Sequence, residues 1–350
     1  MSLSIGIVGL PNSGKSTLFN ALLKRQIADV GEYPFTTVEP NTGVVKVSDN
    51  KLDELSKVLG IEKKVPAAVK FYDIAGLIKG AHEGEGLGNK FLAQIRQVDA
   101  ILHLARGFHS RNVAHVAGRI DPVHDINTIN LELTLADFEL VSKQLKEEKQ
   151  ITAEREKAFK KILKTLGDGK LASEAELDVK EKELIKDLNL LTFKPMLYAL
   201  NLDESAISEF SAAADLPPVM LLSAKLEAEI NELEDKERQE YLKQLGLKES
   251  LLDRLIKECF NLLDLITFFT VKGKKQVQAW PLKKGKTVLE AAEMIHTDFA
   301  KGFIKAELIN WQKLVDLGSW SKAKEKGKLR LVGKEYIVKN GEAIEIHVAK

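Results

Sequence analysis

The segment from Gly9 to Ser16, with the sequence GLPNSGKS, constrains this chain more than any other. It matches the pattern G-x-x-x-x-G-K-[ST] of a phosphate-binding loop. The apolar residues 4–8 before the motif predict a buried strand, and residues 17–23 after it predict a helix. In that order, backbone N–H groups and the positive end of the helix dipole converge on an anion. The alternative, a glycine turn in another α/β protein, is disfavoured because two related motifs follow.

The residue types inside this loop suit distinct tasks. Gly14 leaves space for the loop to approach a phosphate. Lys15 would bring a positive charge to the outer phosphates and thereby assist catalysis, and the Ser16 hydroxyl is a ligand of the kind that Mg²⁺ accepts. The expected phosphate cradle is completed by Asn12, Ser13 and Thr17.

The second motif is Asp73-Ile74-Ala75-Gly76, which follows the strand-like residues 68–72. At this distance behind a phosphate loop, Asp73 is expected in the Mg²⁺ shell and Gly76 is expected to offer its N–H to a γ-phosphate. Between the two motifs lies a turn-rich stretch containing Thr36 and Thr37. A threonine hydroxyl from such a stretch can complete the metal shell only while the γ-phosphate is present, as in a switch loop. Alternatively, both threonines only cap a turn.

The third motif is a base-reading loop, Asn201-Leu202-Asp203-Glu204, after the apolar residues 194–200. Guanine-specific members of this class carry N-K-x-D here, whereas this chain has Leu202 and Glu204 at the lysine and aspartate positions. Adenine presents an acceptor at N1 and a donor amine at C6, so a site for guanine's paired donors would not suit it. The departure weakens the case for GTP without establishing ATP. Ser223 and Ala224 fit the final base-supporting loop, although Ser223 could simply start a helix.

The group that positions the attacking water is not evident. Leu77 follows Gly76, where Ras-like enzymes carry a water-orienting glutamine, and leucine cannot replace it. Two histidines in glycine-containing stretches, His82 and His115, are candidates, although lone histidines more often have structural roles. Asn12 is a candidate for holding a monovalent cation beside the phosphates.

The middle of the chain predicts a helical insertion. The region from Pro122 to Gly167 contains neither proline nor glycine between these ends, and Leu131, Leu135 and Phe138 have the spacing of one helical face. Its second half is densely charged with alternating signs, which is typical of a solvated coiled-coil surface. We expect a turn at residues 167–169 and a returning helix, which together form an antiparallel hairpin at residues 126–190. The nucleotide-binding domain would then comprise residues 1–125 and 191–263, with the hairpin as a plausible arm for docking partners.

Residues 264–350 predict a small sheet with one packed helix, at residues 287–299. Six lysines without an acidic residue among them lie around Trp280 in the sequence: Lys272, Lys274, Lys275, Lys283, Lys284 and Lys286. They fit either contact with phosphates or, as the charge pattern alone favours, a solvated strand edge.

Charge, cysteine content and the lengths of apolar runs exclude several further classes of protein. The chain has 350 residues and a net charge of +1, which excludes attraction of the whole chain to nucleic acid. Cys259 is the only cysteine, so an internal disulfide is excluded, and it is expected to be buried. The beginning of the chain lacks the basic flank of a signal peptide, and no apolar run reaches the ~18 residues that span a bilayer. We therefore expect a cytoplasmic protein with no membrane partner.

With these motifs, the chain resembles the YchF group of Obg-related phosphate-loop NTPases along nearly its whole length. The resemblance is carried by GIVGLPNSGKSTLFNAL, YPFTTVEPNTGVV, DIAGLIKGAHEGEGLGNKFL, DPVHDINTINLEL, NLDE and AWPLKKGKTVLEAAEMIHTDFAKGFIKAE. It implies an α/β fold: a Ras-like phosphate-loop NTPase domain, an inserted antiparallel coiled-coil hairpin, and a C-terminal TGS domain of ubiquitin-like β-grasp fold.

The resemblance also carries functional expectations. It implies a preference for ATP over GTP through Asn201 and Glu204, slow hydrolysis, and association with ribosomes, expected at the large subunit. Thr37 matches the family's Mg²⁺ threonine, His115 matches a histidine implicated in hydrolysis, and the lysines around Trp280 become candidates for RNA contact. We therefore expect a Mg²⁺-dependent, ribosome-associated ATPase that acts as a switch, without DNA specificity. The alternatives are an Obg-type GTPase and an RNA- or ribosome-binding adaptor for which nucleotide is a conformational effector.

Overall fold

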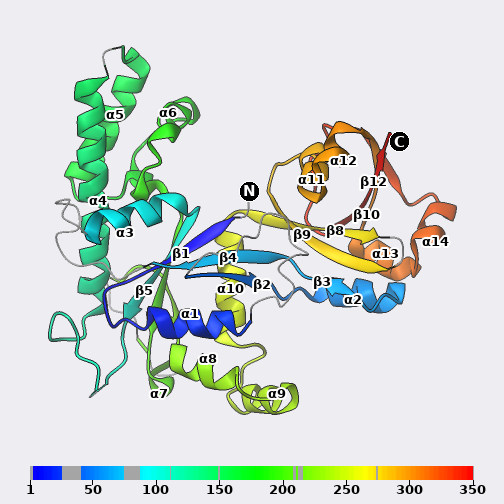
Figure 1. The fold of residues 1–350 in the computed structure, drawn as a ribbon, viewed down its shortest axis with the longest axis horizontal. Coiled ribbons are helices and arrows are strands. Elements are labelled where there is room, and N and C mark those ends of the chain that lie inside the picture. Colours follow the sequence, from blue (N-terminus) through cyan, green and yellow to red (C-terminus); the bar gives the residue numbers. More distant parts are fainter. Residues whose placement is uncertain are drawn as a thin grey trace.

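The computed structural model describes residues 3–25, 41–74, 87–110, 112–148, 150–207, 210–211, 216–272 and 275–349. These residues form two six-stranded sheets that lie side by side, with a helical arm projecting from the first sheet (Figure 1). The first sheet carries the phosphate-binding loop and the second lies in the C-terminal part. The fold is therefore the α/β architecture predicted from the sequence.

The first sheet has the strand order β2-β4-β1-β5-β6-β7. Its strands are β1 (Ser4–Val8), β2 (Thr42–Lys46), β4 (Ala68–Asp73), β5 (Ala100–Arg106), β6 (Met196–Asn201) and β7 (Val219–Leu222). All neighbours are parallel except β2, which pairs antiparallel with β4. Every residue of β1 and β5 is buried, as expected of central strands covered on both faces. In such a sheet, ligands bind beyond the carboxyl ends of the strands.

Helices cover both faces of this sheet. On one face, α1 (Lys15–Leu23) and α10 (Leu251–Leu262) share a core with β1, β4 and β5. On the other, α3 (Leu87–Gln97) and the first half of α4 (Pro122–Glu147) pack on a second core. Cys259 lies fully buried in the first core, as predicted. The shorter helices of this part are α7 (Glu204–Ile207), α8 (Ala224–Ile230) and α9 (Asp235–Gln244).

The helical arm confirms the predicted antiparallel hairpin but places its turn elsewhere. The chain reverses between the end of α4 at Glu147 and the start of α5 (Ala153–Gly167). The predicted turn at residues 167–169 instead ends α5, and the chain returns through α6 (Val179–Leu184) and three short 3-10 helices at Ala172–Glu174, Lys186–Leu188 and Leu191–Phe193. The reversal was missed because it uses neither glycine nor proline; Thr152 caps α5 by accepting a hydrogen bond from the Arg155 N–H.

The apolar spacing seen in the sequence of α4 correctly predicts a helix but does not mark its buried face. Leu131 and Phe138 are 53% and 37% exposed, whereas Leu133 and its neighbours one turn away are buried. The buried face includes Asp137, whose carboxylate accepts hydrogen bonds from the N–H groups of Leu191 and Thr192 and from the Thr192 hydroxyl. An apolar-only pattern therefore selects the wrong face, because this helix buries a carboxylate that receives backbone donors.

The second sheet has the strand order β11-β10-β12-β8-β9-β3. Its C-terminal strands are β8 (Leu265–Lys272), β9 (Gln276–Lys283), β10 (Phe303–Asn310), β11 (Arg330–Val332) and β12 (Glu342–Val348). The hairpin β8–β9 lies beside β12, which runs parallel to β8, and α11 (Val288–Ile295) packs on one face. This is the predicted β-grasp arrangement. The further helices are α12 (Thr297–Lys301), α13 (Trp311–Leu317) and α14 (Trp320–Glu325).

The two sheets are joined by a segment from the N-terminal half of the chain, which the sequence analysis did not anticipate. Between β2 and β4, the chain forms α2 (Asn50–Leu59) and β3 (Lys64–Val65), and β3 extends the second sheet by pairing parallel with β9. Leu55 of α2 belongs to a core that also contains Leu314 of α13 and Phe269 of β8. One continuous apolar core therefore runs through both parts of the molecule.

The six lysines around Trp280 do not form one cluster. Lys283 ends β9, whereas Lys275 precedes its first residue, so the two lie about 26 Å apart along the strand. Lys286 pairs with Glu290, and Trp280 itself is buried against α11. Lys274 and the side chain of Lys272 lie outside the described residues. Among the helices that the structure describes, none is long and apolar enough to cross a membrane.

Candidate functional site

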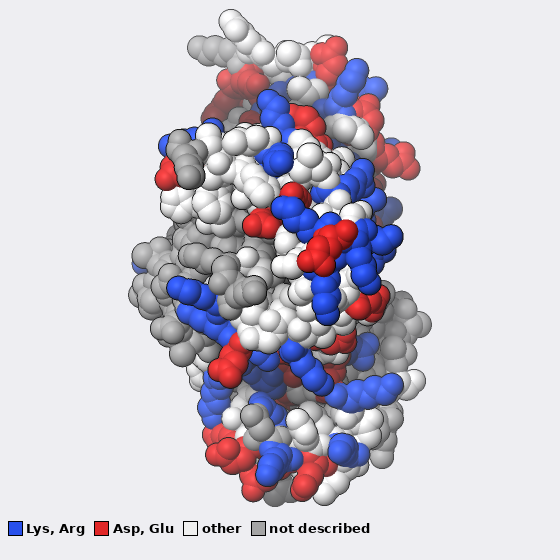
Figure 2. Space-filling model, turned by 90° about the vertical axis from the view of Figure 1, so that its right-hand side faces the viewer, with Lys and Arg blue, Asp and Glu red and all other residues white. Residues whose placement is uncertain are grey.

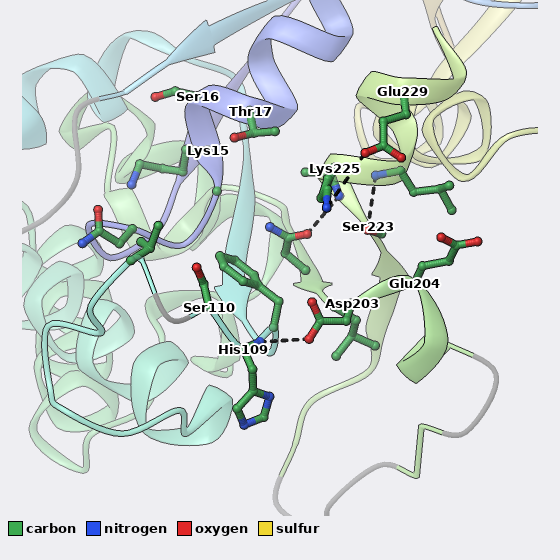
Figure 3. Close-up of a pocket in the computed structure, with 18 residues that line it drawn as sticks. Lys15, Ser16, Thr17, His109, Ser110, Asp203, Glu204, Ser223, Lys225 and Glu229 are labelled. Carbon is green, nitrogen blue, oxygen red and sulfur yellow. Dashed lines mark hydrogen bonds and ion pairs between the residues drawn. The ribbon is translucent and has the colours of Figure 1, made fainter. Parts of the chain in front are cut away.

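A cavity of about 580 Å³ lies at the carboxyl ends of β1, β6 and β7. Its lining comes from the phosphate-binding loop with the first turn of α1, from the loops after β5 and β6, and from the start of α8. Figure 3 shows Lys15, Ser16 and Thr17 on one side of this cavity and Asp203, Glu204 and Ser223 on the other. Two of the three motifs found in the sequence therefore meet at one pocket, as parallel strand order requires.

The phosphate-binding loop depends on a glycine in the left-handed region. Gly14, which precedes the first residue of α1, has φ +96°. A Cβ atom at this position would lie 2.2 Å from the Nδ2 atom of Asn201, so glycine is required for space as well as for backbone conformation. Ser13, immediately before it, is 1% exposed. The loop is thus packed tightly against the base-reading strand.

Lys15 lies folded into the loop. Its ammonium group donates hydrogen bonds to the carbonyl oxygens of Gly9 (3.0 Å) and Leu10 (2.9 Å), and the residue is 7% exposed. Burial lowers the pKa of Lys15 to about 8, an effect that the nearby Asp73 carboxylate partly offsets. A bound phosphate would stabilise the charged form, since opposite charge favours ionisation.

Ser16 and Asp73 come together as predicted for a metal site. The Ser16 hydroxyl donates to the Asp73 carboxylate across 3.3 Å, and burial raises the pKa of Asp73 despite Ser16 and Lys15 nearby. A hydroxyl and a desolvated carboxylate are hard oxygen ligands that suit Mg²⁺. The donor set therefore fits the metal that the motif implies. Thr37 and Gly76, as well as Thr36, Leu77 and His82, lie outside the described residues, so their predicted roles stay predictions.

Asn201 connects the two sides of the pocket. Its amide nitrogen donates to the Ser13 carbonyl (3.0 Å), and its amide oxygen accepts from the Ala224 N–H (2.9 Å). The residue is 5% exposed, so both hydrogen bonds are shielded from water. Asn201 therefore holds the phosphate-binding loop against the start of α8.

The base side of the pocket has three carboxylates, and each has a partner. Asp203 accepts from the His109 N–H (2.9 Å), Glu204 accepts from the Tyr241 hydroxyl (3.3 Å), and Glu229 lies 4.0 Å from the Lys225 ammonium. Leu202, at the lysine position of the guanine motif, is buried. Ser223 caps α8 by accepting from the Leu226 N–H, which is the structural role considered for it, and it also lines the pocket.

The loop after β5 also contributes to the pocket, and this contribution was not predicted from the sequence. Arg106, at the end of β5, is 2% exposed and donates to the carbonyls of Val113 (2.8 Å) and Ala114 (3.3 Å). Its guanidinium group also lies 4.4 Å from the centre of the Phe108 ring, which lines the pocket. The Asn12 amide donates to the same Ala114 carbonyl, which joins this loop to the phosphate cradle. The feature of the sequence that could have indicated this loop is Arg106, a charged residue at the end of a largely apolar strand.

His115 does not line the pocket in this structure. Its Nδ1 atom accepts a hydrogen bond from the Ala117 N–H (3.1 Å), which leaves Nε2 to donate to the Asp125 carboxylate (2.9 Å). Only 5% of the His115 side chain is exposed. The ring is thus held at the start of α4, and a catalytic role would require this pair to open.

Comparison with known proteins places the chain among nucleotide-binding proteins. Residues 4–201 match a family model described as 50S ribosome-binding GTPase, and residues 265–349 match the YchF-GTPase C-terminal model, described as a protein of unknown function. A protein of Bacillus subtilis (strain 168) named ribosome-binding ATPase YchF is 45% identical over 362 residues, covering 98% of each chain. Its namesake in Haemophilus influenzae is 44% identical, again over 98% of each chain. The solved structure of the Schizosaccharomyces pombe YchF GTPase has a TM-score of 0.87 and 32% identity, and the match covers 99% of this chain and 98% of that one.

The fold and the pocket together define a phosphate-loop nucleotide-binding protein with an inserted helical hairpin and a C-terminal β-grasp sheet. Because full-length relatives exceed 40% identity, the assignment can be narrower. The chain belongs to the YchF family.

The low pKa of Lys15 predicts that nucleotide affinity falls in alkaline solution. In the free protein the ammonium loses its proton near pH 8, whereas bound phosphates hold the proton on. Binding of Mg·ADP should therefore be strongest below about pH 7 and weaken about tenfold per pH unit above about pH 8. Calorimetric titrations from about pH 6.5 to about pH 9.5 measure this slope.

The K225A variant is the matched control for this pH series, because Lys225 lies at the same pocket but is 86% exposed. It should keep the slope of the unmodified protein. An affinity that stays constant up to about pH 9.5 in the unmodified protein would contradict the assignment of the slope to Lys15.

Proposed function

We propose that this chain is a Mg²⁺-dependent nucleotide hydrolase that prefers ATP over GTP and acts as a ribosome-associated switch. The observation that supports the base preference best is that each of the three carboxylates lining the base side has one oxygen that is bound to, or paired with, a protein group. Guanine recognition needs a carboxylate that is free to accept from two neighbouring donors of the base. Glu204, at the position of that carboxylate, is turned towards Tyr241 instead.

The mechanism is positioning and electrostatic stabilisation, with no covalent intermediate. Lys15 exchanges its contacts with the Gly9 and Leu10 carbonyls for the outer phosphates, and loop N–H groups bind the remaining oxygens. Ser16, Asp73 and Thr37 would hold Mg²⁺, which supplies compensation for the charge on the β- and γ-phosphates. On the base side, Leu202 and Phe108 offer apolar faces to a planar ring.

In this mechanism the attacking water is activated by His115, which matches the histidine implicated in hydrolysis in the family. In the described structure the imidazole is bound to Asp125, so hydrolysis requires rearrangement of the loop after β5. That loop is joined to the phosphate cradle through Asn12 and Ala114, so nucleotide binding can reach it directly. The hydrogen bond between His115 and Asp125 keeps the imidazole away from the pocket, which agrees with the slow nucleotide hydrolysis that the resemblance implies.

Calorimetric titration of nucleotide-free protein with Mg·ATP and Mg·GTP tests the base preference. We expect ATP to bind at least tenfold more tightly, equivalent to about 1.4 kcal/mol. The double variant L202K/E204D recreates N-K-x-D in the sequence and should shift the preference towards GTP. Equal or tighter binding of GTP to the unmodified protein would favour an Obg-type GTPase.

A matched control for this double variant makes the same chemical changes away from the pocket. The variant L245K/E240D adds a lysine and shortens a glutamate at exposed positions of and after α9. It should keep the nucleotide preference of the unmodified protein. A change of preference in this control would assign the effect to net charge instead of to the base-reading loop.

Ribosome association is proposed from the relatives' names together with a basic surface in the C-terminal part. From Lys322 to Arg330 the chain has five basic residues and one acidic residue. The basic strip consists of the exposed residues Lys322, Lys324, Lys326, Lys328 and Arg330. Ala323, within α14, is fully buried and anchors the segment. Figure 2 looks onto the end of the molecule that the C-terminal part forms and shows groups of basic side chains there, with acidic side chains between them. Such a surface suits the phosphates of ribosomal RNA.

Pelleting with purified ribosomes over a range of salt concentrations tests this surface. Neutralising the four lysines of the basic strip in K322Q/K324Q/K326Q/K328Q should weaken binding at least tenfold and flatten its salt dependence, because fewer counterions are released. The control K46Q/K236Q/K243Q/K248Q removes the same charge from exposed lysines outside both the basic strip and the helical arm. Equal losses in both variants, or no loss in the first, would contradict a docking role of the strip.

A further inference from the structure

A second cavity, of about 480 Å³, lies in the C-terminal part on the face of the sheet that α11 covers. We call it the sheet cavity; its floor includes Thr270, Gln276, Gln278 and Trp280, and its wall includes His296 and Phe299. It exists because α11 ends at Ile295, before it has covered the end of β8 and the start of β9. Its volume is in the range of sites for small organic ligands.

The floor of the sheet cavity carries an unusual buried amide. Along β9, residues 276, 278, 280 and 282 point to the face of α11, and Trp280 and Leu282 belong to its core. Gln278 is 8% exposed at a position where an apolar side chain would be expected. Its amide oxygen accepts from the Gln276 amide nitrogen (3.0 Å). Within the described part of the chain, the side-chain NH₂ group of Gln278 and the side-chain carbonyl of Gln276 have no further hydrogen-bonding partner. A donor and an acceptor therefore lie side by side on the floor of the cavity.

Aromatic rings line the same space. The Trp280 indole is stacked on Phe268, with ring centres 6.3 Å apart and planes 12° apart, and its N–H donates to the Thr270 hydroxyl oxygen (2.8 Å). Phe299 and His296 form a second ring pair, 5.9 Å apart, at the wall. The Thr270 hydroxyl remains able to donate its own hydrogen. Flat apolar surfaces thus surround a short edge of hydrogen-bonding groups.

Charge restricts the occupant further. Of the described residues that line the sheet cavity, only Glu345 carries a permanent charge, and it is exposed. Among the described residues that line the cavity, only His296 can become a cation, and only when it is protonated, so this lining favours a ligand whose buried part is neutral. Lys275 is exposed and directly precedes Gln276, but it does not line the cavity, so a phosphate that it contacts lies outside the cavity.

We propose that the sheet cavity binds a nucleobase, either of unpaired RNA or of a free nucleotide. A nucleobase is flat and neutral and has adjacent donor and acceptor groups on its edge, which match the Gln278 amide and the Gln276 carbonyl. An aliphatic side chain of a protein partner would bury the Gln278 amide without a hydrogen-bonding partner, which disfavours it. This site is separate from the ATP pocket and does not depend on its base preference.

The test uses the full-length protein with its phosphate-loop pocket saturated by Mg·ADP. The four ribonucleosides and short single-stranded oligoribonucleotides are titrated while the three indole N–H signals are followed by NMR. The chain has three tryptophans, and W280F assigns the signal of Trp280. We expect at least one base to shift the Trp280 signal saturably, with the signals of Trp311 and Trp320 unchanged.

Two substitutions of the same kind decide whether the floor reads the base. Q278L keeps the approximate size but removes the hydrogen-bonding groups, and it should weaken binding at least tenfold. Q312L makes the same change at an exposed position of α13 and should leave binding unchanged. F299A, a second variant at the wall, should also weaken binding and covers the case in which Q278L fails to fold.

The K275A variant distinguishes the two possible sources of the base, unpaired RNA and a free nucleotide. An oligonucleotide that binds more tightly than its nucleoside, and loses this advantage in K275A, identifies unpaired RNA as the ligand. Equal affinities for nucleoside and oligonucleotide identify a free nucleotide. The proposal is overturned if no probe shifts the Trp280 signal saturably, or if Q278L and F299A bind as tightly as Q312L.

Discussion

The nucleotide pocket depends on one buried side chain, Asn201, which binds both of its halves. The amide spans from the carbonyl of Ser13 in the phosphate-binding loop to the N–H of Ala224 at the start of α8. Both hydrogen bonds lie out of contact with water, so neither group has an alternative partner if the amide is removed. The close approach also explains Gly14, because any Cβ there would collide with the same amide. Phosphate binding and base binding are therefore mechanically linked.

A second connection joins the nucleotide site to the C-terminal sheet. The segment with α2 and β3 leaves the first sheet after β2, adds a strand to the second sheet beside β9, and returns as β4, which ends at Asp73. Because this segment packs in one continuous core with α13 and β8, a shift of β4 cannot leave the second sheet undisturbed. The C-terminal part that contains this sheet also carries the basic strip, on α14 and the segment leading into β11, and the sheet cavity. This arrangement gives a physical route by which nucleotide state can alter a partner-binding surface.

Sequence reasoning succeeded where local pattern and position in the chain carry the information. The phosphate-binding loop, its flanking strand and helix, and the meeting of Ser16 with Asp73 follow from motif spacing and parallel strand order. It failed where buried polar groups override apolar periodicity, as at Asp137, which moves the packing face of α4 away from Phe138. Contacts between distant segments, such as the pairing of β3 with β9, could not be predicted either. The strand β3 has only two residues, which is too short for a recognisable strand pattern.

The central claim, that Asn201 is a structural connector and not a reader of the base, can be tested by measuring how N201A binds Mg·ATP and Mg·GTP. If the claim holds, both affinities fall by a similar factor, roughly tenfold or more for two lost buried hydrogen bonds, and their ratio stays that of the unmodified protein. The N231A variant, which removes an amide bonded to Arg25 and to the Ala21 carbonyl outside the pocket, provides the control and should bind both nucleotides normally. A loss confined to one nucleotide, or no loss at all, would contradict the claim.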